Sequence, residues 1–203
     1  LDYALRKHRP EVVLFETYSL ARTEANLHTE GDLHRGVDVL APGLRKARLI
    51  ESITPETDCE NYYFNLSKYH SRWKELRRMD WTDASLDWHG YNPEAACVDK
   101  RFSAVDYSAV EETALSPGRV AWLDEFARRC RAAGAEPFFF TAPYNSGAIA
   151  PRLKAMRGYC ASRGIPYLDM NRREDLEAAG GLSLAPCRDF NDPWHLNIRG
   201  AAK

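Results

Sequence analysis

Five segments of the chain alternate between two patterns of apolar residues. Continuous apolar runs at 11–17, 137–142 and 165–170 contain many β-branched and aromatic residues, which predicts three short strands buried on both faces. Between the second and third runs, and before the second, apolar residues recur at helical spacing, which predicts helices over 116–133 and 149–163.

The two predicted helices carry boundary signals. Ser116 followed by Pro117 is typical of an N-cap and a first helical turn, and Gly134 comes where the apolar spacing stops. In the second helix, Leu153, Met156 and Cys160 share one side, and Gly164 stands at the C-terminal cap position.

Strands that alternate with helices over such short separations predict an α/β fold. Because crossover connections are right-handed, we expect a doubly wound, mostly parallel sheet flanked by helices. Ligands of such sheets bind outside the carboxyl ends of the strands, here at 17–19, 142–145 and 169–171.

Almost a hundred residues between the first strand and the first helix do not follow this alternation. We interpret residues from about 21 to 115 as a largely helical insertion into a single domain spanning 1–203. Within it, Asn61 to Arg78 is rich in aromatic residues at spacings that suit an amphipathic helix. Both ends of the insertion connect to the carboxyl side of the sheet, so we expect it to pack there and to shape a binding cleft.

Composition excludes several classes of protein. The 28 Lys and Arg residues against 29 Asp and Glu residues give a formal charge of −1, which argues against a nucleic-acid partner. The longest apolar runs, such as 137–140, fall far short of the ~20 residues that a membrane helix requires.

The five cysteines form no CxxC pair, so we expect no metal site; Cys130 and Cys160 are interpreted as small buried apolar residues. Charge runs such as 172–175 are interpreted as solvated turns or helix faces.

The most specific chemical pattern is Asp192 followed three residues later by His195, on a segment leading into a helical start at Gly200-Ala201. A carboxylate at this spacing can orient the imidazole ring and stabilise the imidazolium that forms when the histidine accepts a proton. The alternative is that the aspartate merely closes a turn.

At this point the sequence resembles a family, the SGNH (GDSL-type) hydrolases, whose last block is DxxH before the final helix. The sequence around Asp192 and His195 is similar to that of one branch of the family, which is found beside membrane-bound O-acyltransferases in bacterial polysaccharide operons. Further segments agree with that branch: 9–16, 69–73, 89–91 and 165–171.

The resemblance implies a flavodoxin-like three-layer fold and a Ser-His-Asp mechanism. In the family, the nucleophilic serine lies in a Gly-x-Ser block on the first strand, and this sequence starts downstream of where that strand would lie. We therefore expect this chain to lack that strand, to carry no nucleophile and to be inactive alone. Tyr18 stands where the family has an Asn donor, and Asn145 is a substitute donor or a turn residue. His70 and Arg72 are candidate substrate-binding residues, with structural pairing inside the insertion as the alternative.

The function we expect is therefore that of an esterase or O-acyltransferase acting on acyl groups, chiefly acetyl, of a cell-surface carbohydrate. His195 would be the general base and Asp192 its orienting partner, with no metal or organic cofactor. The resemblance further implies an extracytoplasmic location, an N-terminal anchor and a membrane-bound O-acyltransferase as partner. The rival hypothesis is a catalytically silent carbohydrate-binding module of the same fold; a nucleotide binder is disfavoured because no GxGxxG or Walker loop occurs.

Overall fold

The computed structural model describes residues 1–21, 36–38, 40–53, 59–63, 74, 97, 107–144, 149–181, 183–192 and 195–203. They belong to two compact units, Leu1–Thr23 with Pro93–Lys203, and Glu24–Asn92. The described elements of the first unit are α1 (Asp2–His8), β1 (Val12–Glu16), α2 (Tyr18–Ala21), η4 (Tyr107–Ala109), α8 (Pro117–Ala132), β2 (Glu136–Thr141), α9 (Ala150–Arg163), β3 (Tyr167–Asp169), α10 (Arg173–Ala178), α11 (Pro186–Asp189) and α12 (Ile198–Ala201). Those of the second unit are α4 (Leu44–Ile53) and α5 (Cys59–Tyr63).

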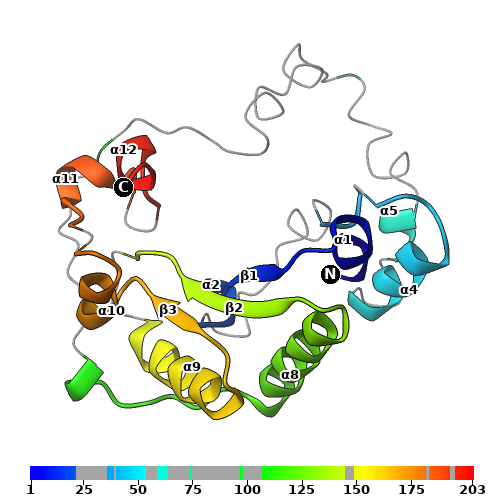
Figure 1. The fold of residues 1–203 in the computed structure, drawn as a ribbon. Helices are drawn as coiled ribbons and strands as arrows, with labels where there is room; N and C mark the ends of the chain where they lie inside the picture. The colour runs from blue at the N-terminus through cyan, green and yellow to red at the C-terminus, as the bar shows by residue number, and fades with distance from the viewer. Residues whose placement is uncertain are drawn as a thin grey trace. The chain divides into compact units, whose positions relative to one another are not determined.

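A three-stranded parallel sheet with the order β1-β2-β3 forms the centre of the first unit (Figure 1). Phe15 of β1 pairs with Phe139 of β2, which pairs in turn with Tyr167 of β3. The three strands and the parallel pairing predicted from the apolar runs are confirmed, and the described part of the unit is of the mixed α/β class.

Helices α8 and α9 lie on the same side of this sheet (Figure 1). Their buried residues form one core with the sheet, in which Leu123 and Cys130 of α8 and Met156 and Cys160 of α9 surround Phe139. A sheet whose order runs steadily from β1 to β3 places both right-handed crossovers on one face, because the chain never reverses direction across the sheet.

On the other face of the sheet, the prediction that the first strand is buried on both faces is wrong. Strand β1 is not buried on both faces: the side chains of Val12 and Leu14 are 50% and 66% exposed, while Val13 and Phe15 pack on the core. Burial of both faces requires helices on each side, and the two long helices α8 and α9 lie on one side (Figure 1). The doubly wound, flavodoxin-like arrangement with three layers stays a prediction.

The helix boundaries follow the signals in the sequence. Ser116 occupies the N-cap of α8 in extended conformation, and Gly134, just beyond the helix, has a φ of 79°. Gly164 caps α9 with a φ of 60° and ψ of 35°, the left-handed region that glycine adopts at little cost. The prediction that Cys130 and Cys160 are buried is confirmed.

The second unit has its own small apolar core. Ile50 of α4 and Tyr62 of α5 are buried with Val37, and Ile53 and Cys59 pack beside them. Helix α5 begins the aromatic segment predicted as one amphipathic helix, but most of Asn61 to Arg78 lies outside the described residues. The insertion from about 21 to 115, and its packing over the sheet, stay predictions.

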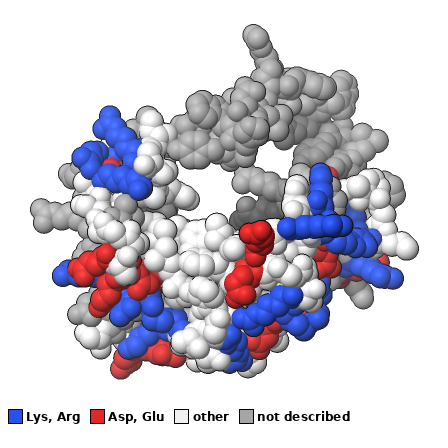
Figure 2. All heavy atoms as spheres, in the orientation of Figure 1, with Lys and Arg blue, Asp and Glu red and all other residues white. Residues whose placement is uncertain are grey.

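Acidic and basic side chains are interspersed over much of the visible face of the described residues, whereas Lys and Arg predominate over α11 and α12 (Figure 2). The charge run at 172–175 is solvated only in part: Arg173 and Glu174 are exposed as predicted, but Asp175 is not. The Asp175 side chain is only 11% exposed and pairs with Arg157 of α9 and with Arg172. Tertiary packing supplied a partner that its local sequence could not indicate.

Candidate active site

The predicted Asp192 and His195 contact each other in the structure. The Nδ1 atom of His195 lies 2.7 Å from Oδ2 of Asp192, and the backbone N–H of His195 donates to Oδ1 of the same carboxylate over 2.8 Å. An ionised carboxylate only accepts hydrogen bonds, so Nδ1 carries the proton in this contact. That tautomer leaves the lone pair of Nε2 as a base, and the described part of the chain offers Nε2 no hydrogen-bond partner.

This pair is in contact with solvent, on the segment between α11 and α12. The side chains of His195 and Asp192 are 66% and 34% exposed. Exposed pairs typically contribute only about 0.2–1 kcal/mol, because water competes for both partners. The contact between the two side chains is therefore too weak to hold the ring in one position by itself.

The loop is closed at its base by backbone hydrogen bonds. Phe190 and Leu196 form an isolated antiparallel bridge, and the N–H of Asn191 donates to the carbonyl of His195 over 2.9 Å. One step further, the N–H of Asn197 donates to the carbonyl of Asp189 over 2.9 Å. The DxxH spacing thus places both side chains on one tight loop between α11 and α12.

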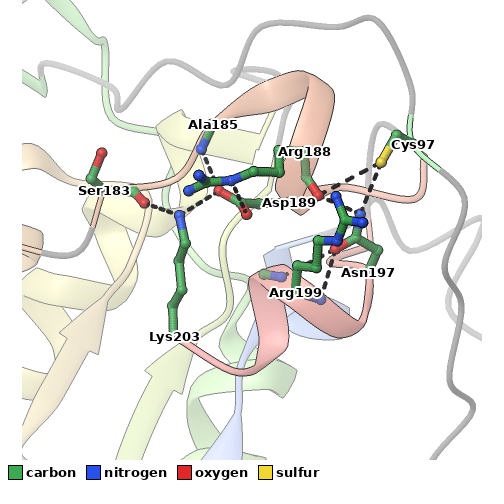
Figure 3. Close-up of polar contacts among 9 residues, drawn as sticks. Cys97, Ser183, Ala185, Arg188, Asp189, Asn197, Arg199 and Lys203 are labelled. Atoms are coloured by element: carbon green, nitrogen blue, oxygen red, sulfur yellow. Dashed lines mark hydrogen bonds and ion pairs between the residues drawn. The ribbon is translucent and has the colours of Figure 1, made fainter.

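Asn197 connects the loop to α12 and to α11. As the N-cap of α12, its Oδ1 accepts the backbone N–H groups of Arg199 and Gly200, which compensates two donors that a helix N-terminus leaves unpaired. Its Nδ2 donates to the carbonyl of Arg188 over 2.6 Å and lies 3.4 Å from the sulfur of Cys97 (Figure 3). The predicted helical start at Gly200-Ala201 is confirmed as part of α12.

A second polar group lies at the carboxyl edge of the sheet. Glu16, the last residue of β1, accepts the backbone N–H of Tyr18 over 2.9 Å and that of Ala142 over 3.3 Å. Its carboxylate thus joins the two loops that leave β1 and β2. Burial raises the pKa of Glu16, while the two backbone hydrogen bonds act in the opposite direction.

Aromatic and amide side chains complete this edge. The rings of Tyr18 and Tyr144 stack with centroids 3.7 Å apart and planes inclined by 13°. Asn171, after β3, accepts the N–H of Tyr144 and donates to the carbonyl of Ala142 over 2.9 Å. Asp169 in turn accepts the backbone N–H of Asn171 over 2.9 Å.

The hydroxyl groups under this edge hydrogen-bond one another in a fixed order. Thr17 Oγ1 donates to the carbonyl of Phe140 and lies 2.6 Å from Thr141 Oγ1, which lies 2.7 Å from the hydroxyl of Tyr167. With the Thr17 proton on the Phe140 carbonyl, Thr141 donates to Thr17 and Tyr167 donates to Thr141. The protons of these three hydroxyl groups are then all used among themselves and the Phe140 carbonyl.

These contacts bear on the oxyanion donors that acyl transfer needs. The backbone N–H groups of Tyr18, Ala142 and Tyr144 all donate to side-chain oxygens of this chain. The carboxyl edge therefore offers none of these three as a free donor to a substrate.

The other predicted site residues divide into two groups. Tyr18 lies at the carboxyl edge as expected, whereas Asn145, His70 and Arg72 lie outside the described residues. Sequence reasoning placed Asn171 in the strand end 169–171 without giving it a role, and it overlooked Glu16 and the buried Asp189. Position at the end of a predicted strand was the available signal for Glu16.

The described part of the chain shows neither a metal centre nor a membrane-spanning helix. No group of three or more His, Cys, Asp or Glu residues there is arranged to hold a metal ion. No helix among the same residues is long and apolar enough to cross a bilayer.

Comparison with family models, with curated proteins and with solved structures finds no match for this chain.

Proposed function

We propose that this chain is the base-bearing part of an SGNH-type esterase or O-acyltransferase that acts on acyl groups of a cell-surface carbohydrate. The observation that carries the proposal is the contact between His195 Nδ1 and the Asp192 carboxylate, which leaves Nε2 as an accessible base. The resemblance of the surrounding sequence to the final block of SGNH hydrolases supplies the reaction class.

In the proposed mechanism, His195 Nε2 takes the proton of a serine hydroxyl as its oxygen attacks the carbonyl carbon of the acyl ester. The carbon–oxygen bond to the carbohydrate breaks, and the leaving oxygen receives the proton from the imidazolium. Water or another sugar hydroxyl then attacks the acyl-enzyme, with His195 again removing and returning the proton. Asp192 keeps Nδ1 protonated and stabilises the imidazolium.

We assign the nucleophile to a Gly-x-Ser block upstream of Leu1. The same upstream segment would supply oxyanion donors, because the N–H groups of Tyr18 and Ala142 are occupied by Glu16. An extracytoplasmic location, an N-terminal anchor and a membrane-bound O-acyltransferase as partner belong to this proposal as well.

An ester-hydrolysis assay tests the proposal on residues 1–203 and on the chain extended upstream of Leu1, called the extended chain. With p-nitrophenyl acetate and an O-acetylated oligosaccharide as substrates, we expect background rates for residues 1–203 and orders of magnitude more for the extended chain. His195→Ala in the extended chain should lower kcat/KM by about 10²- to 10⁴-fold, the contribution of a general base.

His8→Ala is the matched control, because His8 is an exposed histidine of α1. It should leave the rate unchanged. Strong, His195-dependent activity in residues 1–203 alone would mean that the nucleophile lies within this chain, and an extended chain inactive toward every ester would refute the enzyme proposal.

The occupied N–H groups at the carboxyl edge favour one second candidate, a carbohydrate-binding module without activity. In that case Tyr18, with its ring stacked on Tyr144, would be the residue that contacts the sugar. Calorimetric titration with the deacetylated oligosaccharide separates the two functions: binding that is lost in Tyr18→Ala and retained in His195→Ala, without hydrolysis by the extended chain, identifies the module.

A further inference from the structure

The loop that carries Asp192 and His195 is fixed by a buried carboxylate at its base. Asp189, at the end of α11, is fully buried. Its Oδ2 accepts Lys203 Nζ over 2.6 Å and the backbone N–H of Ala185, and its Oδ1 accepts Nε of Arg188 over 3.2 Å (Figure 3). A charge removed from water in this way is costly unless it is paired and hydrogen-bonded, as it is here.

Lys203 joins both ends of the C-terminal segment. Besides Asp189, its ammonium group donates to the carbonyl of Ser183 over 2.6 Å, at the approach to α11. The Lys203 side chain, which follows α12, therefore contacts both the segment that leads into α11 and the last residue of α11.

Two further contacts join α12 to α11. At the N-terminus of α12, the Nδ2 of Asn197 donates to the carbonyl of Arg188. In the middle, Gly200 approaches the backbone so closely that a Cβ built on it would lie 2.1 Å from the carbonyl oxygen of Asp189. Helix α12 thus contacts α11 at three points: at its N-cap through Asn197, along the helix at Gly200, and just after it through Lys203.

This three-point attachment determines where the loop between the helices begins and ends. Its two base residues, Asp189 and Asn197, are buried and joined by a backbone hydrogen bond. His195 is exposed and Asp192 partly exposed, and water competes for the contact between their side chains. The base of the loop constrains the backbone from which both side chains project.

We propose that the ion pair between the buried Asp189 and the partly exposed Lys203 is the positioning element for Asp192 and His195: it holds α12 on α11 and thereby keeps the His195 ring in the Nδ1–H tautomer, against Asp192. Its importance for catalysis rests on the proposed function.

The tautomer of the ring is a direct readout that general loss of stability does not change. With ¹⁵N-labelled histidine, long-range proton–nitrogen spectra at alkaline pH distinguish a protonated from an unprotonated ring nitrogen. The His195→Ala variant of residues 1–203 identifies the His195 signals by their disappearance. In the unsubstituted chain we expect one protonated Nδ1 and one unprotonated Nε2.

Lys203→Met retains the apolar stem and removes the charge. We expect both ring nitrogens of His195 to shift toward a common average in this variant, because the ring then exchanges between tautomers. Lys203→Arg should restore the original shifts. Arg199→Gln is the matched control, since Arg199 is an exposed cation of α12 whose side chain forms no hydrogen bond or ion pair with the described residues.

A second variant keeps the test decisive if Lys203→Met does not fold. Asp189→Asn preserves the shape of the buried side chain, and the Lys203 ammonium, whose side chain is 26% exposed, can then turn to water. Circular dichroism establishes that a variant is folded. Folded Lys203→Met and Asp189→Asn proteins with unchanged His195 shifts would overturn the inference.

Kinetics of the extended chain separate this inference from the proposed function. If both hold, Lys203→Met lowers kcat with little change in KM, and Lys203→Arg recovers most of the loss. If the ring shifts occur but the extended chain hydrolyses no ester, the positioning role stands and the enzyme proposal fails. Normal kcat in a Lys203→Met protein overturns the positioning role.

Discussion

Among the described glycines, Gly200 has the least room for a side chain. It lies buried in α12, where an added Cβ would meet the carbonyl oxygen of Asp189 at 2.1 Å and a side-chain carbon of Leu196 at 2.9 Å. Its φ is not in the left-handed region, so the demand for glycine comes from the close approach of α11 and not from backbone conformation.

The substitution Gly200→Ala should therefore lower the free energy of unfolding by about 1–3 kcal/mol, because the backbone at Asp189 has to move away. Gly158 supplies the opposite case, since it is exposed within α9 and an added Cβ there would meet nothing within 4 Å. Gly158→Ala should raise the stability by about 0.5–1 kcal/mol. Urea unfolding of both variants measures the two effects; a stabilising Gly200→Ala would contradict the packing described.

At the scale of elements, Asp175 ties three of them together. From α10 it accepts the backbone N–H of Asp169 in β3 over 2.8 Å and the guanidinium of Arg157 in α9. Burial by itself would raise the pKa of Asp175, but the Asp169 N–H and the Arg157 guanidinium hold it below its usual value. The short strand β3 thus gains a side-chain contact where its backbone pairing ends.

Replacing Asp175 by Asn should destabilise the first unit by about 2 kcal/mol, because Arg157 loses its charged partner in a partly buried place. The control is Glu177→Gln, an exposed carboxylate of the same helix, which should change stability by less than about 0.5 kcal/mol. Thermal unfolding of the two variants side by side is the measurement. Equal melting temperatures would show that Asp175 does not join these elements.

At the scale of the whole molecule, the buried carboxylates predict sensitivity to acid. Burial opposes ionisation of Asp189, but Lys203, the Ala185 N–H and Arg188 keep its pKa below the usual value, as for Asp175. A carboxyl group whose pKa is lower in the folded state stabilises that state above about pH 4, and the contribution is lost as the pH falls further. Glu16 has the opposite sign, because its raised pKa favours the folded state below its usual value and the gain disappears as the pH rises.

The pKa values of Asp175 and Asp189 are lowered in the folded state and only that of Glu16 is raised among these three groups. The free energy of unfolding should therefore be lower at about pH 3 than at pH 7. In Asp175→Asn this difference should shrink, because one of the groups that bind a proton on unfolding is gone. Urea unfolding at both pH values, on the original chain and this variant, measures the effect. Stability that is equal or higher at the acidic pH would contradict the assignment.

Much of the central layer could be predicted from local pattern. The apolar runs and the signals at Ser116, Gly134 and Gly164 located the three strands and both long helices to within a few residues. Strand β3 is shorter than its apolar run, since only Tyr167, Leu168 and Asp169 are paired in register with β2. These features are local: a helix cap or a strand period is decided by neighbouring residues.

The spacing of Asp192 and His195 likewise determined that the two side chains could meet, because three residues within one turn keep them close whatever surrounds the loop. The exposure of Val12 and Leu14, the burial of Asp189 and the pairing of Asp175 with Arg157 were decided only by the tertiary structure. Each depends on which elements, distant in sequence, pack together and which face remains uncovered. Amino-acid sequence determines the local contacts of a residue directly, whereas its distant partners follow from the free energy of the whole packed chain.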